Sequence, residues 1–185
     1  VVGHAFNTAP QLRAFRWAVS TPASVVQHPD SVSTCPTGTA TFSVAAAGSV
    51  PITYEWQWQP TPGAAWNTII DGLNTDPADG QVRFVADTAQ TETVEIIPTG
   101  GAGTQYSQWD FRALITNTCG SVTSTPATLT FCVGDADCDS DTDSDDIVIF
   151  FTAWDAGESG GDADGDGDTD SDDIIDFFAA WDAGC

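Results

Sequence analysis

The sequence predicts a mainly β protein with a small α module, in which an antiparallel β-sandwich is followed by two paired loop–helix units. Short runs of alternating apolar and polar residues, separated by Gly, Pro and Asn, fill residues 22–133. After Val133 an aspartate-rich pattern occurs twice, each time followed by an apolar run with helical spacing. We therefore expect three parts, at residues 1–21, 22–133 and 134–185.

The charge of the chain is strongly negative and unevenly distributed. The 185 residues carry a formal net charge of −23, from 27 acids and four arginines. Residues 1–134 hold nine acids and all four arginines, a net of −5, whereas residues 135–185 hold eighteen acids and no base, a net of −18. Because this field repels phosphate, we expect no nucleic-acid partner. No run reaches the ~20 apolar residues of a membrane span.

Four segments of the central part alternate in the manner of strands with one buried face. The residues expected on the buried faces are Ala40, Phe42 and Val44; Ile52, Tyr54, Trp56 and Trp58; Trp109, Phe111, Ala113 and Ile115; and Ala127, Leu129 and Phe131. Strands at this spacing over about a hundred residues are typical of an antiparallel sandwich.

The order of these features resembles bacterial Ig-like domains over residues 22–133. The resemblance rests on Cys35, Tyr54-x-Trp56, Val94-x-Ile96, Asp110-Phe111-x-Ala113 and Asn117-x-Cys119-Gly-Ser. It implies that Trp56 is the buried tryptophan of strand C, that Phe111 takes the place of the corner tyrosine, and that the domain is a spacer or adhesive module. It also indicates a Cys35–Cys119 disulfide.

Three tryptophans raise the alternative of sugar binding on an exposed aromatic platform. Trp58 and Trp109 share the alternation of the expected core residues, so we expect core packing for both. Trp66 follows Pro62-Gly63 in a loop-like stretch and is the best candidate for an exposed ring.

Residues 1–21 contain "VVG" and "RAFRW", which resemble one copy of the HAF repeat of bacterial extracellular β-rich proteins. We expect the remnant of an upstream repeat, or a linker, because one copy cannot stack on a neighbour. Since the chain also opens without Met, we expect it to be the C-terminal region of a longer protein.

The C-terminal part contains two copies of one sequence unit. "GDADCDSDTDSDDIVIFFTAWDAG" (residues 134–157) realigns without a gap on "GDADGDGDTDSDDIIDFFAAWDAG" (residues 161–184). An acidic tail that stays unfolded has no reason to repeat in register, nor to place apolar residues at helical spacing. Each unit therefore predicts an ordered loop followed by one helix, with Ser144 and Ser171 expected as the helix N-caps.

Each loop has the ligand spacing of an EF-hand-type calcium loop. We call residues 135–146 loop 1 and residues 162–173 loop 2. Aspartates stand at positions 1, 3, 5, 7, 9 and 12 of both: Asp135, Asp137, Asp139, Asp141, Asp143 and Asp146, then Asp162, Asp164, Asp166, Asp168, Asp170 and Asp173. Ca²⁺ takes six to eight oxygens, whereas Mg²⁺ keeps several waters, so we expect two calcium ions.

The two loops differ at position 6, where the backbone must turn sharply. Loop 2 has Gly167 there and loop 1 has Ser140. Because glycine takes such conformations without steric penalty, we expect loop 2 to bind calcium more tightly.

Residues 132–185 resemble a type I dockerin, and more closely the dockerin-like modules that close large secreted bacterial proteins. The residues that carry the resemblance are Cys132, "FFTAW", "FFAAW" and Gly184-Cys185. The resemblance implies a docking partner such as a cohesin-like or cell-envelope protein. Positions 10 and 11 of each loop would contact it, which here are Ser144, Asp145, Ser171 and Asp172.

Five cysteines in an acidic, β-rich chain favour an oxidising, extracellular or cell-surface location. We expect Cys132 to pair with Cys185, because that bond would tie together the two ends of the repeated unit. Cys138 is then the one cysteine without an expected partner in the chain, and it is either free or bonded to another chain.

No catalytic motif is recognisable. His4 and His28 are the only histidines, and neither has a nucleophile motif beside it. We therefore expect a non-catalytic C-terminal region of a secreted or cell-surface protein, in which the Ig-like spacer presents the dockerin-like module. The alternatives are an adhesive or carbohydrate-binding module, and the tail of a secreted polysaccharide-degrading enzyme whose catalytic domain lies upstream.

Overall fold

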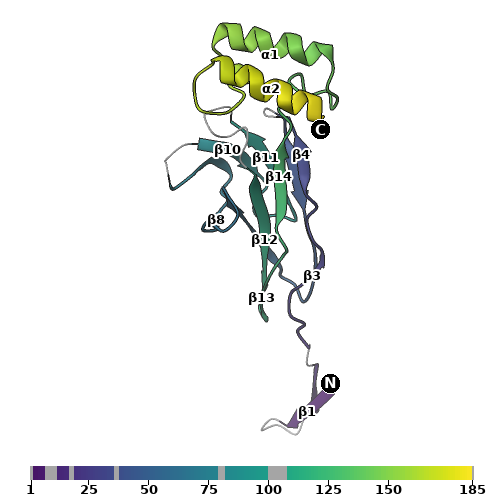
Figure 1. Cartoon of the computed structure of the whole chain (residues 1–185). Helices are drawn as coiled ribbons and strands as arrows, with labels where there is room; N and C mark the ends of the chain where they lie inside the picture. Colours follow the sequence, from purple (N-terminus) through teal and green to yellow (C-terminus); the bar gives the residue numbers. More distant parts are fainter. Residues whose placement is uncertain are drawn as a thin grey trace.

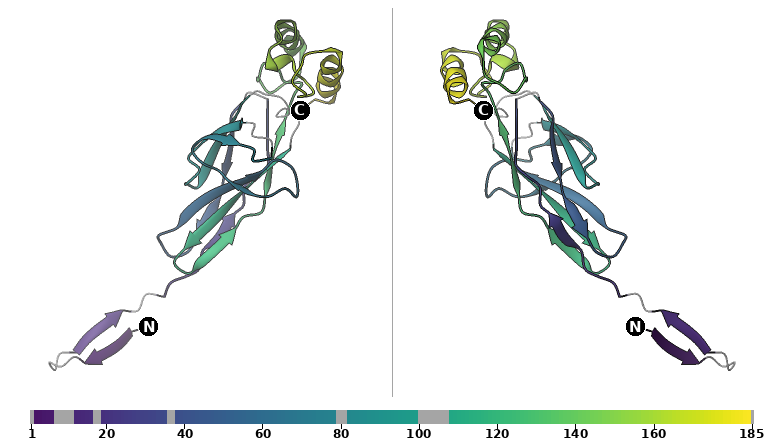
Figure 2. Two further views of the ribbon diagram at one scale, coloured as in Figure 1. Left: turned by 90° about the vertical axis from the view of Figure 1, so that its left-hand side faces the viewer. Right: turned by 90° about the vertical axis from the view of Figure 1, so that its right-hand side faces the viewer.

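The computed structural model describes residues 2–6, 12–16, 19–35, 38–78, 82–99 and 108–184. Two strands near the N-terminus, β1 (Val2–Phe6) and β2 (Leu12–Arg16), form an antiparallel hairpin. Figure 2 places this hairpin and the two helices at opposite ends of a central β-sandwich.

Two sheets form the sandwich. One has the strand order β5 (Ala40–Ser43), β11 (Thr93–Pro98), β10 (Val82–Asp87) and β9 (Gly72–Thr75). The other has the order β4 (Val32–Thr34), β14 (Ala127–Phe131), β12 (Trp109–Asn117), β7 (Thr53–Gln59) and β8 (Asn67–Thr68), and β13 (Gly120–Thr123) pairs with β12. A short pair, β3 (Ser24–Gln27) with β6 (Ala45–Ala47), completes the described strands.

The strand order is that of an Ig-like sandwich. Strand β7 pairs with β12, and β12 continues through a hairpin into β13, so the central strands of this sheet come from distant parts of the chain. The other sheet brings β5 beside β11 and β11 beside β10. Strands β5 and β7, which only the short β6 separates along the chain, thus lie in different sheets, as strands B and C do in Ig-like folds. At the edge of this sheet, β4 runs parallel to β14, the last described strand.

The core lies between the sheets, where the alternation of the sequence predicts it. Along β12 every second residue is buried, beginning with Trp109. Trp56, Trp58 and Phe111 are each at most 1% exposed, which confirms their assignment to the core. Phe111 stacks on Phe42 of the opposite sheet, with ring centroids 4.7 Å apart.

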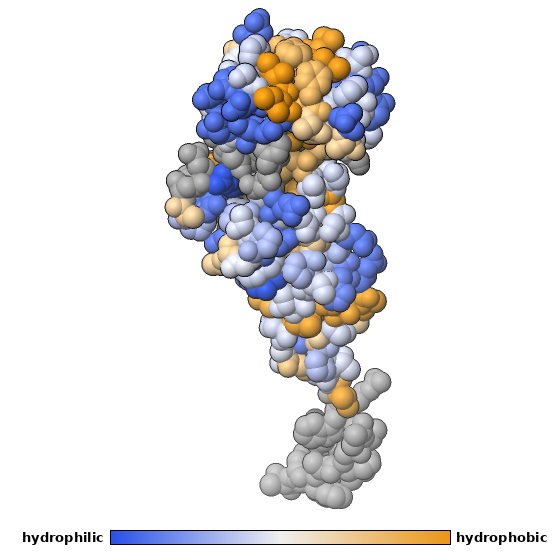
Figure 3. All heavy atoms as spheres, in the orientation of Figure 1, coloured by the Kyte–Doolittle hydropathy of each residue, from blue (hydrophilic) through white to orange (hydrophobic). Residues whose placement is uncertain are grey.

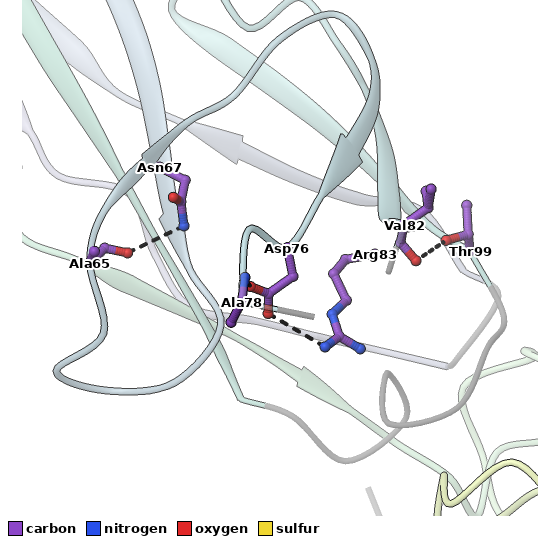
Figure 4. A network of polar contacts seen from close by, with 7 residues as sticks. All are labelled: Ala65, Asn67, Asp76, Ala78, Val82, Arg83 and Thr99. Atoms are coloured by element: carbon purple, nitrogen blue, oxygen red, sulfur yellow. Dashed lines mark hydrogen bonds and ion pairs between the residues drawn. The ribbon is translucent and has the colours of Figure 1, made fainter. Parts of the chain in front are cut away.

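One ion pair is largely buried at the edge of the sandwich. Asp76, which is 4% exposed, accepts a hydrogen bond from the backbone N–H of Ala78 at 2.9 Å and lies 3.4 Å from Nη2 of Arg83. Figure 4 shows Asp76 and Arg83 pointing toward each other across the β9–β10 connection. Since a buried charge needs a partner, we interpret this pair as structural.

Two helices follow the sandwich directly: α1 (Ser144–Ala156) and α2 (Ser171–Ala183), with a single 3₁₀ turn, η1 (Ser159–Gly161), between them. They lie side by side beyond the ends of β4 and β14 (Figure 1). A second hydrophobic cluster holds them together, built on Val133, Phe150, Ala163 and Phe177. No described helix is long and apolar enough to span a bilayer.

We predict that Trp56→Ala destabilises the sandwich by about 3–5 kcal/mol, because it removes a fully buried aromatic side chain. Chemical denaturation followed by tryptophan fluorescence measures the change. Ile70→Ala is the matched control, since Ile70 is 58% exposed, and we expect a change within about 0.5 kcal/mol. Equal, small effects of the two substitutions would contradict the burial of Trp56.

Candidate metal centre

Carboxylates from both ends of each loop converge at position 12. In loop 1 three carboxylate oxygens, one each from Asp135, Asp137 and Asp146, lie within 4.8 Å of one another, and the same holds for Asp141, Asp143 and Asp146. Loop 2 has the same two groups, at positions 1, 3 and 12 and at positions 7, 9 and 12: Asp162, Asp164 and Asp173, then Asp168, Asp170 and Asp173. Ten of the twelve predicted ligands therefore converge.

The position 5 aspartates, Asp139 and Asp166, do not belong to these groups. Their Oδ1 atoms accept the backbone N–H groups of Asp141 and Asp168, at 3.1 Å in both loops. Each bond spans two residues and closes a local turn between positions 5 and 7.

The carboxylate at position 12 ties the start of each loop to the start of its helix. Oδ1 of Asp146 accepts the backbone N–H groups of Ala136 at 2.7 Å and Asp137 at 3.2 Å, and Oδ2 accepts that of Asp143 at 2.7 Å. Loop 2 repeats this pattern around Asp173 with lengths that differ by at most 0.1 Å. Both side chains are 1% exposed.

Position 1 is also buried, and in loop 2 it leaves one oxygen without a donor. Oδ2 of Asp162 accepts the N–H of Gly167 at 3.1 Å, but Oδ1 is buried and has no hydrogen-bond partner. In loop 1 both oxygens of Asp135 are used, by the N–H groups of Asp139 and Ser140. A buried carboxylate oxygen without a partner is costly, so its position is suited to a cation.

The helix N-caps are Asp143 and Asp170, one residue earlier than expected. The prediction of Ser144 and Ser171 as N-caps was wrong, because these serines are the first helical residues. Oδ1 of Asp143 accepts the N–H of Asp145 at 2.7 Å, while Asp146 bonds back to the N–H of Asp143 in a capping box. The position 9 aspartate therefore both caps the helix and faces the candidate site.

Aromatic residues of each helix bind the other unit. Nε1 of Trp154 in α1 donates to the carbonyl of Asp170 at 2.8 Å, and Nε1 of Trp181 in α2 donates to the carbonyl of Asp143 at 2.8 Å. Between them Phe150 and Phe177 stack with centroids 4.0 Å apart and planes 6° apart. The contacts between the two units are thus reciprocal, as in an approximate twofold symmetry. The tryptophan of each helix binds the loop of the other unit.

Two glycines missed by the sequence analysis make this exchange possible. A Cβ on Gly134 would lie 2.8 Å from Cα of Trp181, and a Cβ on Gly161 would overlap the backbone of Trp154. Each loop therefore packs backbone to backbone on the helix of the other unit. Their repetition immediately before position 1 is the sequence signal that could have revealed them.

The backbone turns twice through positive φ in each loop. At position 6, φ is 76° for Ser140 and 97° for Gly167, as the sequence predicted. At position 4, φ is 66° for Cys138 and 75° for Gly165, which the sequence analysis did not anticipate. Loop 1 thus places two residues with a Cβ where loop 2 has glycine.

The disulfide prediction at Cys35 was wrong. Cys35 bonds to Cys138, with Cα atoms 5.4 Å apart, whereas Cys119 is an exposed free cysteine at the β12–β13 turn. Cys35 follows the end of β4 and so lies near loop 1, at the end of the sandwich opposite the β12–β13 turn, and Cys138 is therefore not left over. Cys132 is disulfide-bonded, and its expected partner Cys185 lies outside the described residues.

The aromatic and histidine candidates of the sandwich have structural surroundings. Trp66 is half-buried and the guanidinium of Arg112 lies 4.0 Å from its ring centroid, so one face of the expected sugar platform is covered. Nδ1 of His28 accepts the backbone N–H of Thr125 at 2.9 Å. The side chain of His4 lies outside the described part.

The four predicted partner contacts are exposed at the first turns of the two helices: Ser144, Asp145, Ser171 and Asp172. Apolar side chains continue from them along each helix. Val148 and Ile175, related by the repeat, are 62% and 65% exposed, and Ile149 and Phe178 are 46% and 37% exposed. Figure 3 shows this apolar surface over the helices, with hydrophilic surface on both sides.

No known protein family matches the sequence, and no curated protein does. Among solved structures, a titin fragment of three Ig domains aligns with 60% of this chain and 32% of its own length, at 17% identity and a TM-score of 0.40. A trigonal crystal form of a titin domain aligns with 62% of this chain and 99% of its own, at 16% identity and a TM-score of 0.39. The tandem Ig repeats of Dlar align with 60% of this chain and 48% of their own length, at 21% identity and a TM-score of 0.39. These likenesses are too distant to carry an argument, so the Ig-like assignment rests on the strand order.

Crowding of carboxylates raises several pKa values in the loops. Burial raises the pKa of Asp162 above its usual range. The neighbouring charges of Asp139 and Asp166 raise the pKa of Asp141 and of Asp168, respectively. The charged forms are therefore disfavoured in the folded loops when no cation is present.

We predict opposite pH dependences of the helical module without and with calcium. Without calcium the folded loops bind more protons than the unfolded chain, so stability falls as pH rises from the usual aspartate range through the raised pKa values. With calcium the ligands must be deprotonated, so stability rises over the same interval. The measurement is the thermal midpoint of the far-UV helical signal at several pH values. A calcium-free module that gains stability as pH rises would contradict the prediction.

Proposed function

We propose that the chain is a non-catalytic attachment region, in which an Ig-like spacer carries a calcium-stabilised module for docking to a partner protein or the cell envelope. The observation that carries the calcium part is the convergence of carboxylates on position 12 in both loops, with Oδ1 of Asp162 buried and without a donor. A divalent cation would satisfy that oxygen and offset the repulsion among its neighbours.

The arrangement of lone pairs also supports calcium. Each carboxylate oxygen has two acceptor sites. Backbone N–H groups use both sites on Oδ1 of Asp146 and of Asp173, but Oδ2 of each accepts one N–H and keeps a site for a cation. The twelve loop aspartates would hold two ions, with the position 7 carbonyls as further ligands in the manner of EF-hand-type loops. Mg²⁺ is the weaker candidate, since it prefers fewer protein ligands than these loops offer.

The exposed helix faces support a docking role. Val148 and Ile175 occupy equivalent places on the two helices and are among the most exposed apolar residues described. Asp145 and Asp172 flank them at the helix starts. The expected partner is therefore a protein, cohesin-like or of the cell envelope, whose apolar face is bordered by Lys or Arg.

The disulfides support an extracellular or cell-surface location. Cys35 and Cys138 are bonded to each other, and Cys132 is also disulfide-bonded. Such bonds persist in oxidising compartments, where free calcium is also high enough for sites with dissociation constants of about 10⁻⁴–10⁻³ M.

We predict that the full chain binds two calcium ions and gains helical signal as it does so, because cation binding removes the repulsion that opposes folding of the loops. Isothermal titration calorimetry gives the stoichiometry and far-UV circular dichroism the ordering. Asp135→Asn and Asp162→Asn should each remove one site. Asp155→Asn is the matched control, since Asp155 is an exposed acid of α1 outside the loops. Absence of binding at millimolar calcium would refute the calcium assignment.

The docking part is tested by capture of extracellular and cell-envelope proteins on the immobilised chain. We expect capture to require calcium. We also expect it to be lost in the double variant Val148→Asp, Ile175→Asp, because these two substitutions lie outside the loops. Binding to polysaccharide that is independent of calcium would instead favour the adhesive alternative.

We also predict that loop 2 binds calcium more tightly than loop 1. Ser140→Gly should strengthen loop 1 about fivefold, because it relieves roughly 1 kcal/mol of steric strain at positive φ. Gly167→Ala is the reciprocal control and should weaken loop 2. Two equal sites that respond to neither change would refute the role of position 6.

A further inference from the structure

The disulfide between Cys35 and Cys138 attaches loop 1 to the sandwich within the run of predicted ligands. Cys138 is at position 4, between the ligand positions of Asp137 and Asp139. Loop 2 has Gly165 at the same position and therefore has no such attachment. The repeat thus contains a bonded loop and an unbonded loop that otherwise share the same aspartates.

The segment from Cys132 to Cys138, which leads into loop 1 and includes its first four residues, is held at both ends by the same part of the sandwich. Phe131 pairs with Thr34 in the parallel β4–β14 ladder, and the N–H of Cys132 donates to the carbonyl of Thr34 at 2.8 Å. Cys138 is bonded to Cys35, the residue after Thr34. The segment from Cys132 to Cys138, which contains Asp135 and Asp137, therefore begins and ends beside the same strand end.

The sandwich side of this attachment is fixed. Cys35 is 4% exposed, and its carbonyl accepts the N–H of Gly38 at 3.0 Å. The loop side adopts a conformation that a free residue rarely takes, since φ is 66° at Cys138 and 76° at Ser140. Without the bond, these two residues would leave the left-handed region more readily. Calcium binding would then have to return them to this backbone conformation.

We propose that the Cys35–Cys138 disulfide pre-organises loop 1, so that the oxidation state of this bond sets the calcium affinity of loop 1 and not that of loop 2. The proposal rests on the calcium function proposed above and deepens it. Restricting the unbound loop lowers the conformational entropy lost on binding, so the oxidised loop binds more tightly.

The coupling must act in both directions. Reduction by an external dithiol transfers two electrons and two protons to the bond, giving the thiols of Cys35 and Cys138, while the dithiol becomes its cyclic disulfide. Because linkage is reciprocal, calcium on loop 1 must shift this equilibrium toward the disulfide by the factor by which the disulfide tightens calcium.

The test compares the unmodified full chain with its Cys35→Ser variant in a calcium titration that is monitored by NMR. The amides of Ser140 and Gly167 occupy the same position in the two loops and report on them separately. We expect loop 1 to weaken at least about fivefold, the lower end of typical couplings between sites, with loop 2 unchanged. Cys119→Ser is the matched control, because it removes the exposed free thiol.

A second measurement uses the unmodified chain and does not depend on how the variant folds. The chain is equilibrated with a dithiol buffer with and without calcium, and the Cys35–Cys138 bond is quantified by alkylation and peptide mass spectrometry. We expect calcium to raise the oxidised fraction by the same factor. An unchanged loop 1 affinity in Cys35→Ser, or a reduction equilibrium insensitive to calcium, overturns the proposal while calcium binding stands. If neither amide responds to calcium in the unmodified chain, the proposed function fails and this inference with it.

Discussion

The hydrogen bonds to the carboxylate at position 12 of each loop are the interaction on which the C-terminal part, residues 134–185, depends. By accepting three backbone N–H groups, Asp146 and Asp173 join the start of the loop, its end and the first turn of the helix into one unit. The exchanged tryptophan bonds then reach carbonyls whose positions these hydrogen bonds fix. The two units consequently form one body around a shared aromatic core, although each has only a single helix.

Period-two alternation made the core of the sandwich predictable from the sequence. A strand with one face buried between sheets must repeat every second residue, so Trp56, Trp58 and Trp109 could be assigned before any pairing was known. The predicted ligand positions could be recognised for a related reason. In an EF-hand-type loop most ligands occupy every second position, and this spacing can be counted directly in the sequence. The same count could not tell which serine or aspartate caps the helix, since both residue types serve as N-caps.

The features that the sequence did not reveal depend on contacts between distant segments. Cys35 and Cys138 are 103 residues apart, and the parallel pairing of β4 with β14 brings the end of β4 beside the start of loop 1. One face of Trp66 is covered by Arg112, and the two residues meet because β8 and β12 both pair with β7. Gly134 and Gly161 lie against helices of the other unit. The disulfide and the Arg112 contact leave no local pattern in the sequence, and the repeat marks the two glycines without indicating what they contact.

The Cys35–Cys138 bond also changes how the molecule responds to mechanical load. When the two ends of the chain are pulled apart, force passes from Cys35 to Cys138 through the bond, and the intervening segment is bypassed. That segment contains every strand from β5 to β14. Its 103-residue span would otherwise release about 350 Å of extended chain on unfolding. The strands from β5 to β14 are therefore covalently closed, and tension applied at the chain ends does not extend them.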